Sequence, residues 1–457
     1  MKTLFLYIPH FTFTSDLLRT NFIGELAKKF KIIVFSPTFQ NNDVADYFQH
    51  PNLEYVAADV EYPKFWLIFT KLFRLAMVRE FDQLEYLKLR WREKTNWNWQ
   101  RIALRMVSKI LPSSMTTADF FTRLEKRLLP ASKKFKAYVE KYHPTIILTC
   151  TPGFTTFEAE AIVQAKKLRL PTVAIDSSWD NYTSNSVQIR KTDYLICWNK
   201  QMKNEAMELH GYPENKVFIS GAYRFDHHFQ RANSASTNAP AQMDFLKSKG
   251  LDPNRKTLLL ATLPPNTYPK QYAVWETLIN WQKENKFNEP VNLFFRIHPN
   301  DEPERYKKYE GIPNVHIELA GHSVKGVANN QLKVEMDEND LDNLYYSLKY
   351  TDININFRSS LNLETVIYDT PSINLALYGY RPRYHVDWYM PLVESGGIKL
   401  VATEEELKTA INNYLENPKL DSEGRKKIFD EYIGFRDGLS YQRSVEAIEK
   451  IASGING

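Results

Sequence analysis

With 457 residues, the chain is about twice as long as the size at which one hydrophobic core stops growing, which predicts two domains. Its composition, 43% hydrophobic and 25% charged, is that of a globular protein and excludes a disordered or fibrous chain. The net charge of +5 suits anionic ligands, and the absence of a basic run, a zinc-finger spacing or an RNA-recognition signature excludes nucleic acid as an expected partner.

The chain begins with a short apolar run, TLFLYI. One lysine precedes it and no small-residue cleavage site follows, so we predict a first β-strand rather than a signal peptide. No uncharged apolar stretch approaches the ~20 residues that span a bilayer. Cys150 and Cys197 each end an apolar run and are expected to be buried thiols in a reducing compartment. A cytoplasmic location is therefore expected, either in solution or at the inner face of the cytoplasmic membrane.

Apolar runs alternate with amphipathic segments through residues 1–232. The runs TLFLYI, KIIVFS, TIILTC, TVAI, DYLICW and KVFIS predict strands. The segments Asp16–Phe30, Thr155–Lys167 and Gln201–His210 have helical spacing. This alternation is typical of a doubly wound parallel sheet, and we assign the stretch to an N-terminal domain.

Residues 63–129 interrupt that alternation with a long, aromatic, helix-patterned insertion. Between Lys64 and Arg127 there are 14 lysines and arginines against six acidic residues, with Trp91, Trp97 and Trp99 interleaved. Such a segment can lie on an anionic membrane surface or near a lipid-linked acceptor. The other interpretation is a helical insertion that packs on its own domain with a solvated basic face.

A polar stretch of small residues, Gln230–Gln242, predicts a linker. The alternation then resumes over residues 243–435 with TLLLAT, VNLFFRI, NVHIEL, DININF, SINLAL and IKLVAT. These runs predict a second α/β domain, and residues 436–457 predict a final helix that packs back toward the N-terminal domain. Ligands of such sheets bind beyond the carboxyl ends of the strands, so the loops there carry the candidate sites.

Four stretches are similar to the GT-B glycosyltransferase superfamily: IPHFTFTSDLLRTNFIGELAKKF, VAIDSSWDNYTS, NEAMELHGYPENKVFISGAYRFD, and RIHP with FRSSLNLETVIYDTPSINL. They resemble most its bacterial surface-carbohydrate branch (capsule and lipopolysaccharide), related to CDP-glycerol glycerophosphotransferases. The resemblance covers nearly the whole chain. It implies two Rossmann-like domains with a deep interdomain cleft, a nucleotide-sugar donor on the C-terminal domain and an acceptor on the N-terminal domain.

The candidate donor site contains cations and hydroxyls that suit a phosphate. Arg296 and His298 end the run VNLFFRI, where a guanidinium and an imidazole ring can contact phosphate oxygens. Ser359 and Ser360 stand between DININF and a predicted helix, so their hydroxyls and the first backbone amides form an anion site. A plain helix N-cap is the alternative role for these serines.

Further donor contacts are predicted around these residues. Glu364 falls one helical turn after Ser360, where the resemblance implies a carboxylate that accepts hydrogen bonds from ribose hydroxyls. Arg358 departs from the smaller residue that the resemblance implies there. Thr262 and Asn266 belong to the loop after TLLLA and would line one wall of the phosphate pocket.

An inverting transfer needs a base that accepts the proton of the acceptor hydroxyl. Asp180, in the polar loop after TVAI, is the first candidate, and Asp176 competes with it. Either residue can instead form a simple Asx-turn. His10 is another possible base, and Asp16 and Arg19 lie in the same loop region on the acceptor side.

The motifs of other enzyme classes are missing from the sequence. No GxSxG, GxxxxGK[ST] or HExxH motif occurs, and no DxD motif stands in a suitable loop. His227 and His228 have no partners at metal-ligand spacing and are interpreted as hinge residues, so no metal or other cofactor is expected.

The predicted function is transfer of a sugar from a nucleotide-activated donor to a surface-glycan or lipid-linked acceptor, without a metal. Three alternatives stay open: a transferase that uses CMP-linked acidic sugars (sialic acid or Kdo) or CDP-glycerol, an enzyme like the UDP-N-acetylglucosamine 2-epimerases, which share the fold, and a non-catalytic scaffold.

Overall fold

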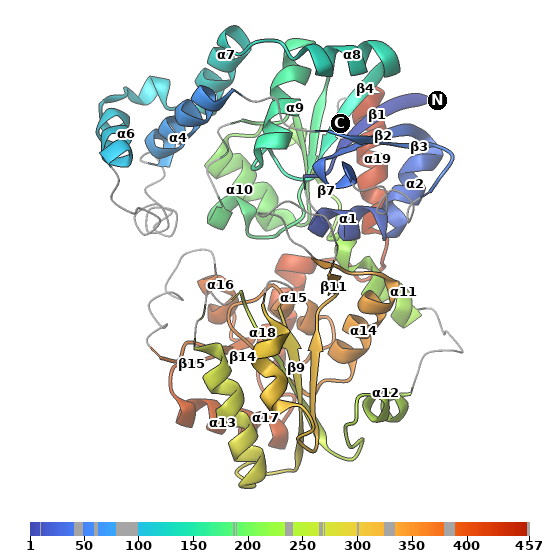
Figure 1. The fold of residues 1–457 in the computed structure, drawn as a ribbon, viewed down its shortest axis with the longest axis vertical. Helices are drawn as coiled ribbons and strands as arrows, with labels where there is room; N and C mark the ends of the chain where they lie inside the picture. Colours follow the sequence, from blue (N-terminus) through green and yellow to red (C-terminus); the bar gives the residue numbers. More distant parts are fainter. Residues whose placement is uncertain are drawn as a thin grey trace. The chain divides into compact units, whose positions relative to one another are not determined.

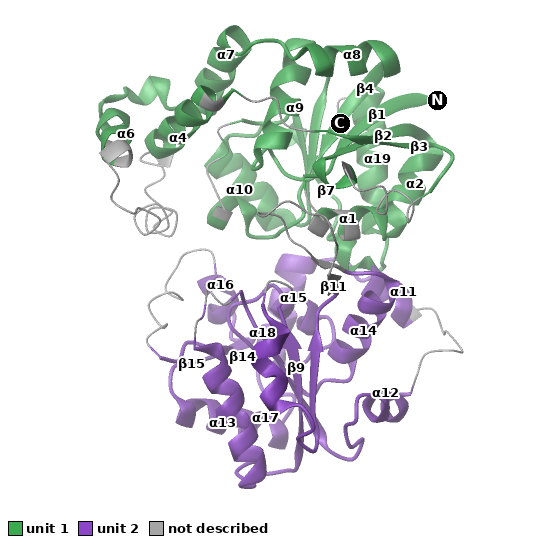
Figure 2. Cartoon of the chain, viewed as in Figure 1, with its two compact units in different colours: residues 1–226, 437–457 green, residues 227–436 purple. Residues whose placement is uncertain are grey.

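The computed structural model of the chain contains two compact units, which Figure 2 distinguishes by colour. It describes residues 1–9, 11–40, 49–58, 63–78, 99–185, 188, 190–233, 241–264, 268, 270–298, 301–323, 334–378 and 389–454. The first unit contains residues 1–226 and 437–457, and the second contains residues 227–436. Residues 227–232, which the sequence assigned to the N-terminal domain, therefore belong to the second unit. None of the helices described is both long enough and apolar enough to span a membrane.

A seven-stranded parallel sheet in the order β3-β2-β1-β4-β5-β6-β7 forms the centre of the first unit (Figure 1). The strands are β1 (Lys2–Tyr7), β2 (Phe30–Ser36), β3 (Leu53–Ala57), β4 (Pro144–Thr149), β5 (Thr172–Ile175), β6 (Tyr194–Cys197) and β7 (Val217–Ile219). All six predicted runs form strands, because strands buried on both faces are continuously apolar. The edge strand β3 was missed, since its residues are only half-buried and carry no such run.

Helices connect and cover these strands: α1 (Phe11–Leu18), α2 (Asn21–Lys29), α4 (Lys64–Val78), α6 (Trp99–Ile110), α7 (Ala118–Leu128), α8 (Lys133–Tyr142), α9 (Thr156–Lys167) and α10 (Lys200–His210). Shorter turns are η1 (Pro37–Gln40), η2 (Ser113–Met115), η3 (Asn181–Asn185), η4 (Glu214–Lys216) and η5 (Tyr223–Phe225). The helix predicted over residues 16–30 is two helices with a break at Arg19 and Thr20, and Phe30 already begins β2.

The end of the chain returns to the first unit as helix α19 (Ser440–Ala452). Its apolar face, which includes Val445, Ile448 and Ile451, is buried. The Asp226 carboxylate accepts hydrogen bonds from the backbone amides of Ser440 (3.1 Å) and Tyr441 (2.8 Å). A side chain at the end of the stretch 1–226 thus caps the helix and satisfies its first unpaired amides.

The helical insertion packs on its own unit through a buried ion pair. Arg190, which lies before β6, donates from Nε to Glu125 Oε2 of α7 (2.8 Å) and from Nη2 to Thr70 Oγ1 of α4 (2.9 Å). The indole N–H of Trp66 on α4 donates to the same carboxylate. The side chains of Glu125 and Arg190 are 0% and 3% exposed, so these contacts tie two insertion helices to the sheet connections.

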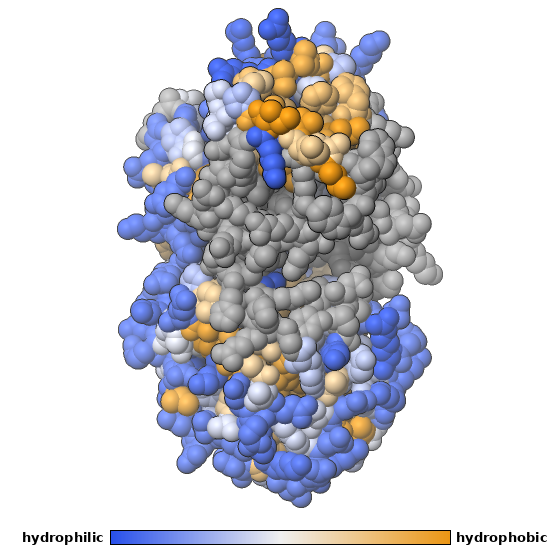
Figure 3. Space-filling model, turned by 90° about the vertical axis from the view of Figure 1, so that its left-hand side faces the viewer, coloured by the Kyte–Doolittle hydropathy of each residue, from blue (hydrophilic) through white to orange (hydrophobic). Residues whose placement is uncertain are grey.

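The same insertion leaves apolar side chains exposed on α4 and α6, as Figure 3 shows for this side of the molecule. On α4, three residues at helical spacing are exposed, namely Phe65, Ile68 and Phe69. On α6, the exposed apolar residues are Ile102, Met106, Val107 and Ile110. Packing on the unit and an exposed amphipathic face therefore coexist in this segment. Trp91 and Trp97 lie outside the described residues.

The second unit is built on a six-stranded parallel sheet in the order β10-β9-β8-β13-β14-β15. The strands are β8 (Lys256–Ala261), β9 (Val291–Ile297), β10 (Val315–Leu319), β13 (Ile353–Asn356), β14 (Ser372–Leu375) and β15 (Ile398–Val401), each of them predicted. A separate antiparallel pair joins β11 (His322–Ser323) and β12 (Val334–Glu335). Both large sheets have the doubly wound order: the first three strands are added toward one edge of the sheet, and the fourth strand is added on the other side of the first. The predicted α/β fold class is confirmed.

Helices cover both faces of this sheet: α11 (Asp226–Asn233), α12 (Gln242–Ser248), α13 (Gln271–Lys283), α14 (Glu338–Lys349), α15 (Leu361–Val366), α16 (Met390–Glu394), α17 (Glu404–Glu416) and α18 (Ser422–Ile428). Shorter helical turns are η6 (Pro303–Tyr309) and η8 (Phe429–Ile433). One side of the core is aromatic, and the Trp275 ring stacks on Phe295 with ring centroids 4.1 Å apart.

Candidate functional site

Three of the predicted donor loops meet at the switch point of the second sheet. Strand β8 lies between β9 and β13, and the three strands are parallel. Thr262 follows β8, His298 follows β9, and Ser359 follows β13 by a short turn. Adjacent strands are about 4.8 Å apart, so the ends of β9 and β13, on either side of β8, are separated by about 10 Å. Ligands of such sheets bind beyond the carboxyl ends of the strands at this point.

His298 is fixed at this edge by its backbone and its loop. Its amide donates to Thr262 Oγ1 (2.8 Å), and the Thr262 amide donates to the carbonyl of Arg296 (3.0 Å). Asp301 is buried and accepts hydrogen bonds from Gln271 and the Tyr306 hydroxyl, which anchors the loop after β9. Thr262 therefore positions His298.

Burial lowers the pKa of His298 to about 4, although the negative charge of Asp301 raises it in part. The imidazole is therefore neutral near pH 7 and acts as a hydrogen-bond donor or acceptor rather than as an imidazolium.

The turn between β13 and α15, residues 357–360, is called the serine turn here, and its backbone is strained but held by hydrogen bonds. Arg358 has a φ of 64°, in the left-handed region that a residue with a side chain rarely adopts. The Ser359 amide donates to Asn356 Oδ1 (3.1 Å), and Ser359 Oγ accepts from the Leu361 amide (3.2 Å). The Ser359 hydroxyl thus pairs one amide of the first turn of α15, while Ser360, the N-cap residue, is exposed and makes no side-chain cap bond.

A buried network of amide side chains supports this turn. Asn362 on α15 contacts Asn356 on β13 (2.7 Å), Asn374 on β14 (2.9 Å) and the Tyr389 hydroxyl. Asn354 Nδ2 also donates to Asn362 Oδ1 (3.1 Å). All five residues are fully buried, so the network fixes α15 and the serine turn on the sheet. This network was not predicted from the sequence, although the asparagines that alternate inside the apolar run DININF were an available signal.

Arg296 does not join this group. It lies opposite Glu318 in the register of β9 and β10, and its guanidinium forms an ion pair with that carboxylate. Burial would raise the pKa of Glu318, but Arg296 and Lys249 outweigh it and the pKa falls to about 2. The guanidinium is 7% exposed and already paired, so the geometry favours a structural role over the phosphate contact predicted for it.

Glu364 and His228 form a second buried contact within the second unit. His228 Nε2 lies 3.3 Å from Glu364 Oε2, and its Nδ1 lies 2.7 Å from the Tyr368 hydroxyl. Glu364 is 6% exposed. His227 and His228 begin the second unit, where the sequence placed a hinge. The His228 ring is also buried and contacts the carboxylate assigned to the ribose.

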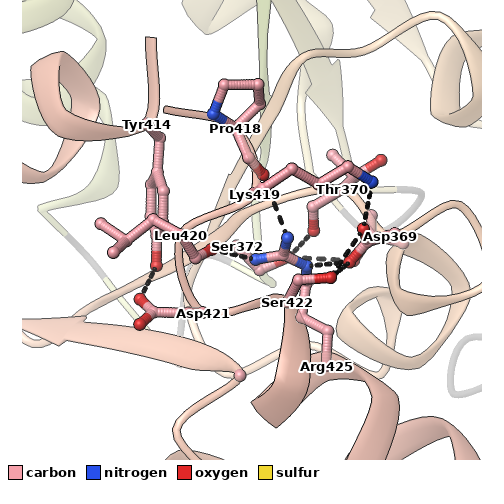
Figure 4. Close-up of polar contacts among 12 residues, drawn as sticks. Asp369, Thr370, Ser372, Tyr414, Pro418, Lys419, Leu420, Asp421, Ser422 and Arg425 are labelled. Atoms are coloured by element: carbon pink, nitrogen blue, oxygen red, sulfur yellow. Dashed lines mark hydrogen bonds and ion pairs between the residues drawn. The ribbon is translucent and has the colours of Figure 1, made fainter. Parts of the chain in front are cut away.

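Figure 4 shows how the end of α15 is attached to α18. Arg425 donates from Nε to Asp369 Oδ1 (2.7 Å), and its other nitrogens donate to the carbonyls of Leu420 and Pro418. Ser422 donates to the same carboxylate (2.9 Å). Arg425 is almost fully buried, so this cluster holds the helix that follows the serine turn.

The first unit places the predicted acceptor residues at the carboxyl edge of its own sheet. Asp16 on α1 lies 3.8 Å from Arg224, whose guanidinium also reaches the carbonyl of Ser177. Arg19 follows α1 and is half-buried. His10 of this loop and Asn266 of the donor loop lie outside the described residues.

Three carboxylates gather near the end of β5. Asp176 is fully buried, and burial raises its pKa to about 7 against hydrogen bonds from Asn181 and the Ser178 amide. Burial also raises the pKa of Glu205 on α10 to about 7, and Asp180 and Asp176 add repulsion. Asp180 accepts hydrogen bonds from the hydroxyls of two neighbouring serines. The sequence predicted Asp176 and Asp180, which follow β5, but missed Glu205, which lies on helix α10.

The raised pKa of Asp176 has a testable consequence. Between about pH 4 and about pH 7 the folded state retains a proton that the unfolded chain releases, so this residue makes the protein less stable as pH rises. Asp176→Asn keeps the acceptor oxygen and should flatten that decline in denaturant-unfolding measurements across this range. Glu208→Gln, exposed on α10, is the matched control, and an unchanged slope for Asp176→Asn would contradict the assignment.

Within the described residues, no group of three or more histidine, cysteine, aspartate or glutamate side chains is arranged to hold a metal ion. Cys150 and Cys197 are buried free thiols, as predicted.

Comparison with known proteins shows which solved structures share this fold. No protein-family model matches the chain, and no curated protein matches it in sequence. Solved structures match along almost its whole length. A UDP-GlcNAc 2-epimerase from Neisseria meningitidis bound to UDP-GlcNAc is 13% identical with a TM-score of 0.55, over 98% of this chain and 100% of that one. The chain has the GT-B-type fold.

Two transferases have the same architecture. A glycosyltransferase from Rickettsia africae is 11% identical with a TM-score of 0.50, over 99% of this chain and 98% of that one. The wall teichoic acid polymerase TagF with CDPG is 13% identical with a TM-score of 0.52, over 99% of this chain and 89% of that one. The resemblance to the GT-B superfamily is thus confirmed at the level of fold, and the identities are too low to carry a reaction.

Proposed function

We propose that the chain is a glycosyltransferase that binds a nucleotide-activated sugar on its second unit and transfers the sugar without a metal. The observation that carries the proposal is the switch point of the second sheet, where the His298 loop and the serine turn lie on either side of β8. Structural neighbours bound to UDP-GlcNAc or CDPG support a nucleotide-linked donor.

In this proposal the donor site stabilises the leaving phosphate. The bond between the anomeric carbon and the phosphate oxygen breaks, and negative charge grows on the nucleotide. The neutral His298 ring and the Ser359 and Ser360 hydroxyls would donate hydrogen bonds to that charge. Glu364, oriented by His228, would accept hydrogen bonds from the ribose.

The first unit would supply the acceptor and the base. Asp180 is the proposed base, with Asp176 and His10 as competing candidates. A carboxylate that is ionised near neutral pH accepts the proton of the acceptor hydroxyl as the oxygen attacks the anomeric carbon. The proposed acceptor is a surface glycan or a lipid-linked glycan. The exposed apolar residues of α4 and α6, in a segment rich in lysine and arginine, support association with the cytoplasmic face of a membrane. Co-flotation of the chain with phosphatidylglycerol vesicles tests that association.

A nucleotide screen tests the proposal. We expect UDP, CMP or CDP to raise the melting temperature of the full chain, since a ligand at 100 times its Kd stabilises the folded state by about 2.7 kcal/mol. The nucleotide that stabilises then selects the donor sugars to assay for transfer by mass spectrometry. Ser359→Ala/Ser360→Ala should remove most of the shift. Stabilisation by none of the three nucleotides would count against the whole proposal.

A 2-epimerase is the second candidate, because the structure brings Asp176, Asp180 and Glu205 into electrostatic contact. The sequence had shown only scattered acidic residues in these loops. Incubation with UDP-N-acetylglucosamine alone separates the two functions. An epimerase changes the configuration of the sugar without an acceptor, whereas a transferase leaves the nucleotide sugar unchanged or hydrolyses it.

A further inference from the structure

A surface cavity of about 860 Å³ opens at the amino-terminal ends of β5, β6 and β7 in the first unit. Helix α7, the end of α9 and the segments that lead into these strands form its wall. Its volume falls within the range of about 300–1,000 Å³ that holds small-molecule ligands. The three carboxylates Asp176, Asp180 and Glu205 belong to the opposite, carboxyl edge of the sheet, so the cavity is separate from the proposed acceptor site.

Basic side chains dominate this cavity. Six of them line it, from four separate segments: Arg123, Lys126, Lys166, Arg169, Lys191 and Lys216. Among the described residues, the acidic side chains that line it are Asp119 and Asp193. Both are already engaged, because Lys191 lies 3.5 Å from Asp119 and Lys166 lies 3.7 Å from Asp193. The cavity therefore carries a surplus of positive charge.

Three of these cations have no partner among the described residues. No hydrogen bond or ion pair in the described part of the chain reaches the side chains of Arg123, Lys126 or Arg169. Burial lowers the pKa of Lys166. The charges of Asp193 and Asp119 raise it in part, and the positive charges of Lys191 and Lys126 lower it. Like charges held around one hollow oppose folding, and a bound anion would relieve that repulsion.

We propose that this cavity binds a ligand that carries two or more phosphate groups, at a site separate from the donor turn of the second unit. The guanidinium groups suit bidentate contacts with phosphate oxygens, and the lysines add point charges. Tyr194, Tyr212 and Pro213 on the wall supply apolar surface for the remainder of the ligand. The phosphates can belong to a soluble phosphorylated sugar or to lipid head groups, which present the same anion.

Calorimetric titration of the full chain with inorganic tripolyphosphate tests the proposal. Arg123→Gln/Lys126→Gln removes two exposed cations from α7, and Arg127→Gln on the same helix lies outside the cavity and is the matched control. We expect the double variant to bind about tenfold more weakly or worse, since two charge-assisted contacts are lost. The control should bind like the wild type. The melting temperature of the unliganded double variant should equal or exceed that of the wild type, because repulsion is relieved.

Two further arms identify the source of the anion. The titration is repeated in the Ser359→Ala/Ser360→Ala background, which weakens any tripolyphosphate binding at the donor turn. Binding that remains there and depends on Arg123 and Lys126 belongs to the cavity. Failure of the donor proposal and failure of the cavity proposal are therefore distinguishable. Flotation with phosphatidylglycerol vesicles that depends on Arg123 and Lys126 supports a lipid source, and binding of tripolyphosphate alone supports a soluble one. Equal binding by the double variant and the wild type, an equal loss in Arg127→Gln, or no binding of either probe would overturn the proposal.

Discussion

Glu125→Gln should lower the free energy of unfolding of the first unit by about 3–5 kcal/mol, the cost of leaving one member of a buried ion pair without its partner. The carboxylate accepts from Arg190 and from the indole of Trp66, and its side chain is fully buried. Glutamine keeps the shape but removes the charge, and its NH₂ group faces donors. Hydrogen exchange of peptides from α4, α7 and β6 measures the loss unit by unit.

An exposed ion pair of the same kind is the control for this prediction. Glu140 lies 3.5 Å from Lys136 on α8, with side chains 65% and 63% exposed. Glu140→Gln should change stability by no more than about 0.5 kcal/mol. Similar losses in the two variants would show that burial does not set the strength of the Glu125 pair.

His298→Ala should lower the turnover of the proposed transferase by about 10²–10³-fold, as expected when one preorganised donor to a developing negative charge is removed. The pKa of about 4 keeps the ring neutral at physiological pH, so His298→Gln, which also offers a neutral N–H, should retain part of the activity. Initial rates with the donor found in the nucleotide screen measure both variants.

The pH profile separates this role from a purely structural one. The neutral ring does not lose a proton between about pH 6 and about pH 8. The pH profile of turnover across that range should therefore have the same shape in the wild type and in His298→Gln. His143→Asn is the control. His143 is the left-handed C-cap of α8 in the first unit, remote in sequence from the donor site, so turnover should be unchanged. Full activity of His298→Ala would contradict its place at the leaving phosphate.

Much of the architecture could be predicted because it is encoded locally. A strand buried on both faces must be apolar along its length, so TLLLAT or TIILTC can be recognised without knowledge of its neighbours. The end of such a run also marks where a loop begins. His298, Ser359 and Asp176 were therefore predicted at carboxyl ends of strands, and the structure places them there.

Which residues pair with one another could not be read in the same way. Arg296 was assigned to a phosphate because its partner Glu318 lies on a different strand, and only the register of β9 and β10 brings the two together. His228 and Glu364 are 136 positions apart, and Glu205 on α10 interacts electrostatically with Asp176, which follows β5.

The sequence by itself determined the number of units, the runs that become strands and the loops that follow them, since these depend on local periodicity and on turn residues. Only the tertiary structure decided which charges are neutralised and which are left over, as in the cavity beside α7. The physical reason is that the energy of a charge depends on its burial and on groups within a few ångströms, and neighbours in space come from distant parts of the chain.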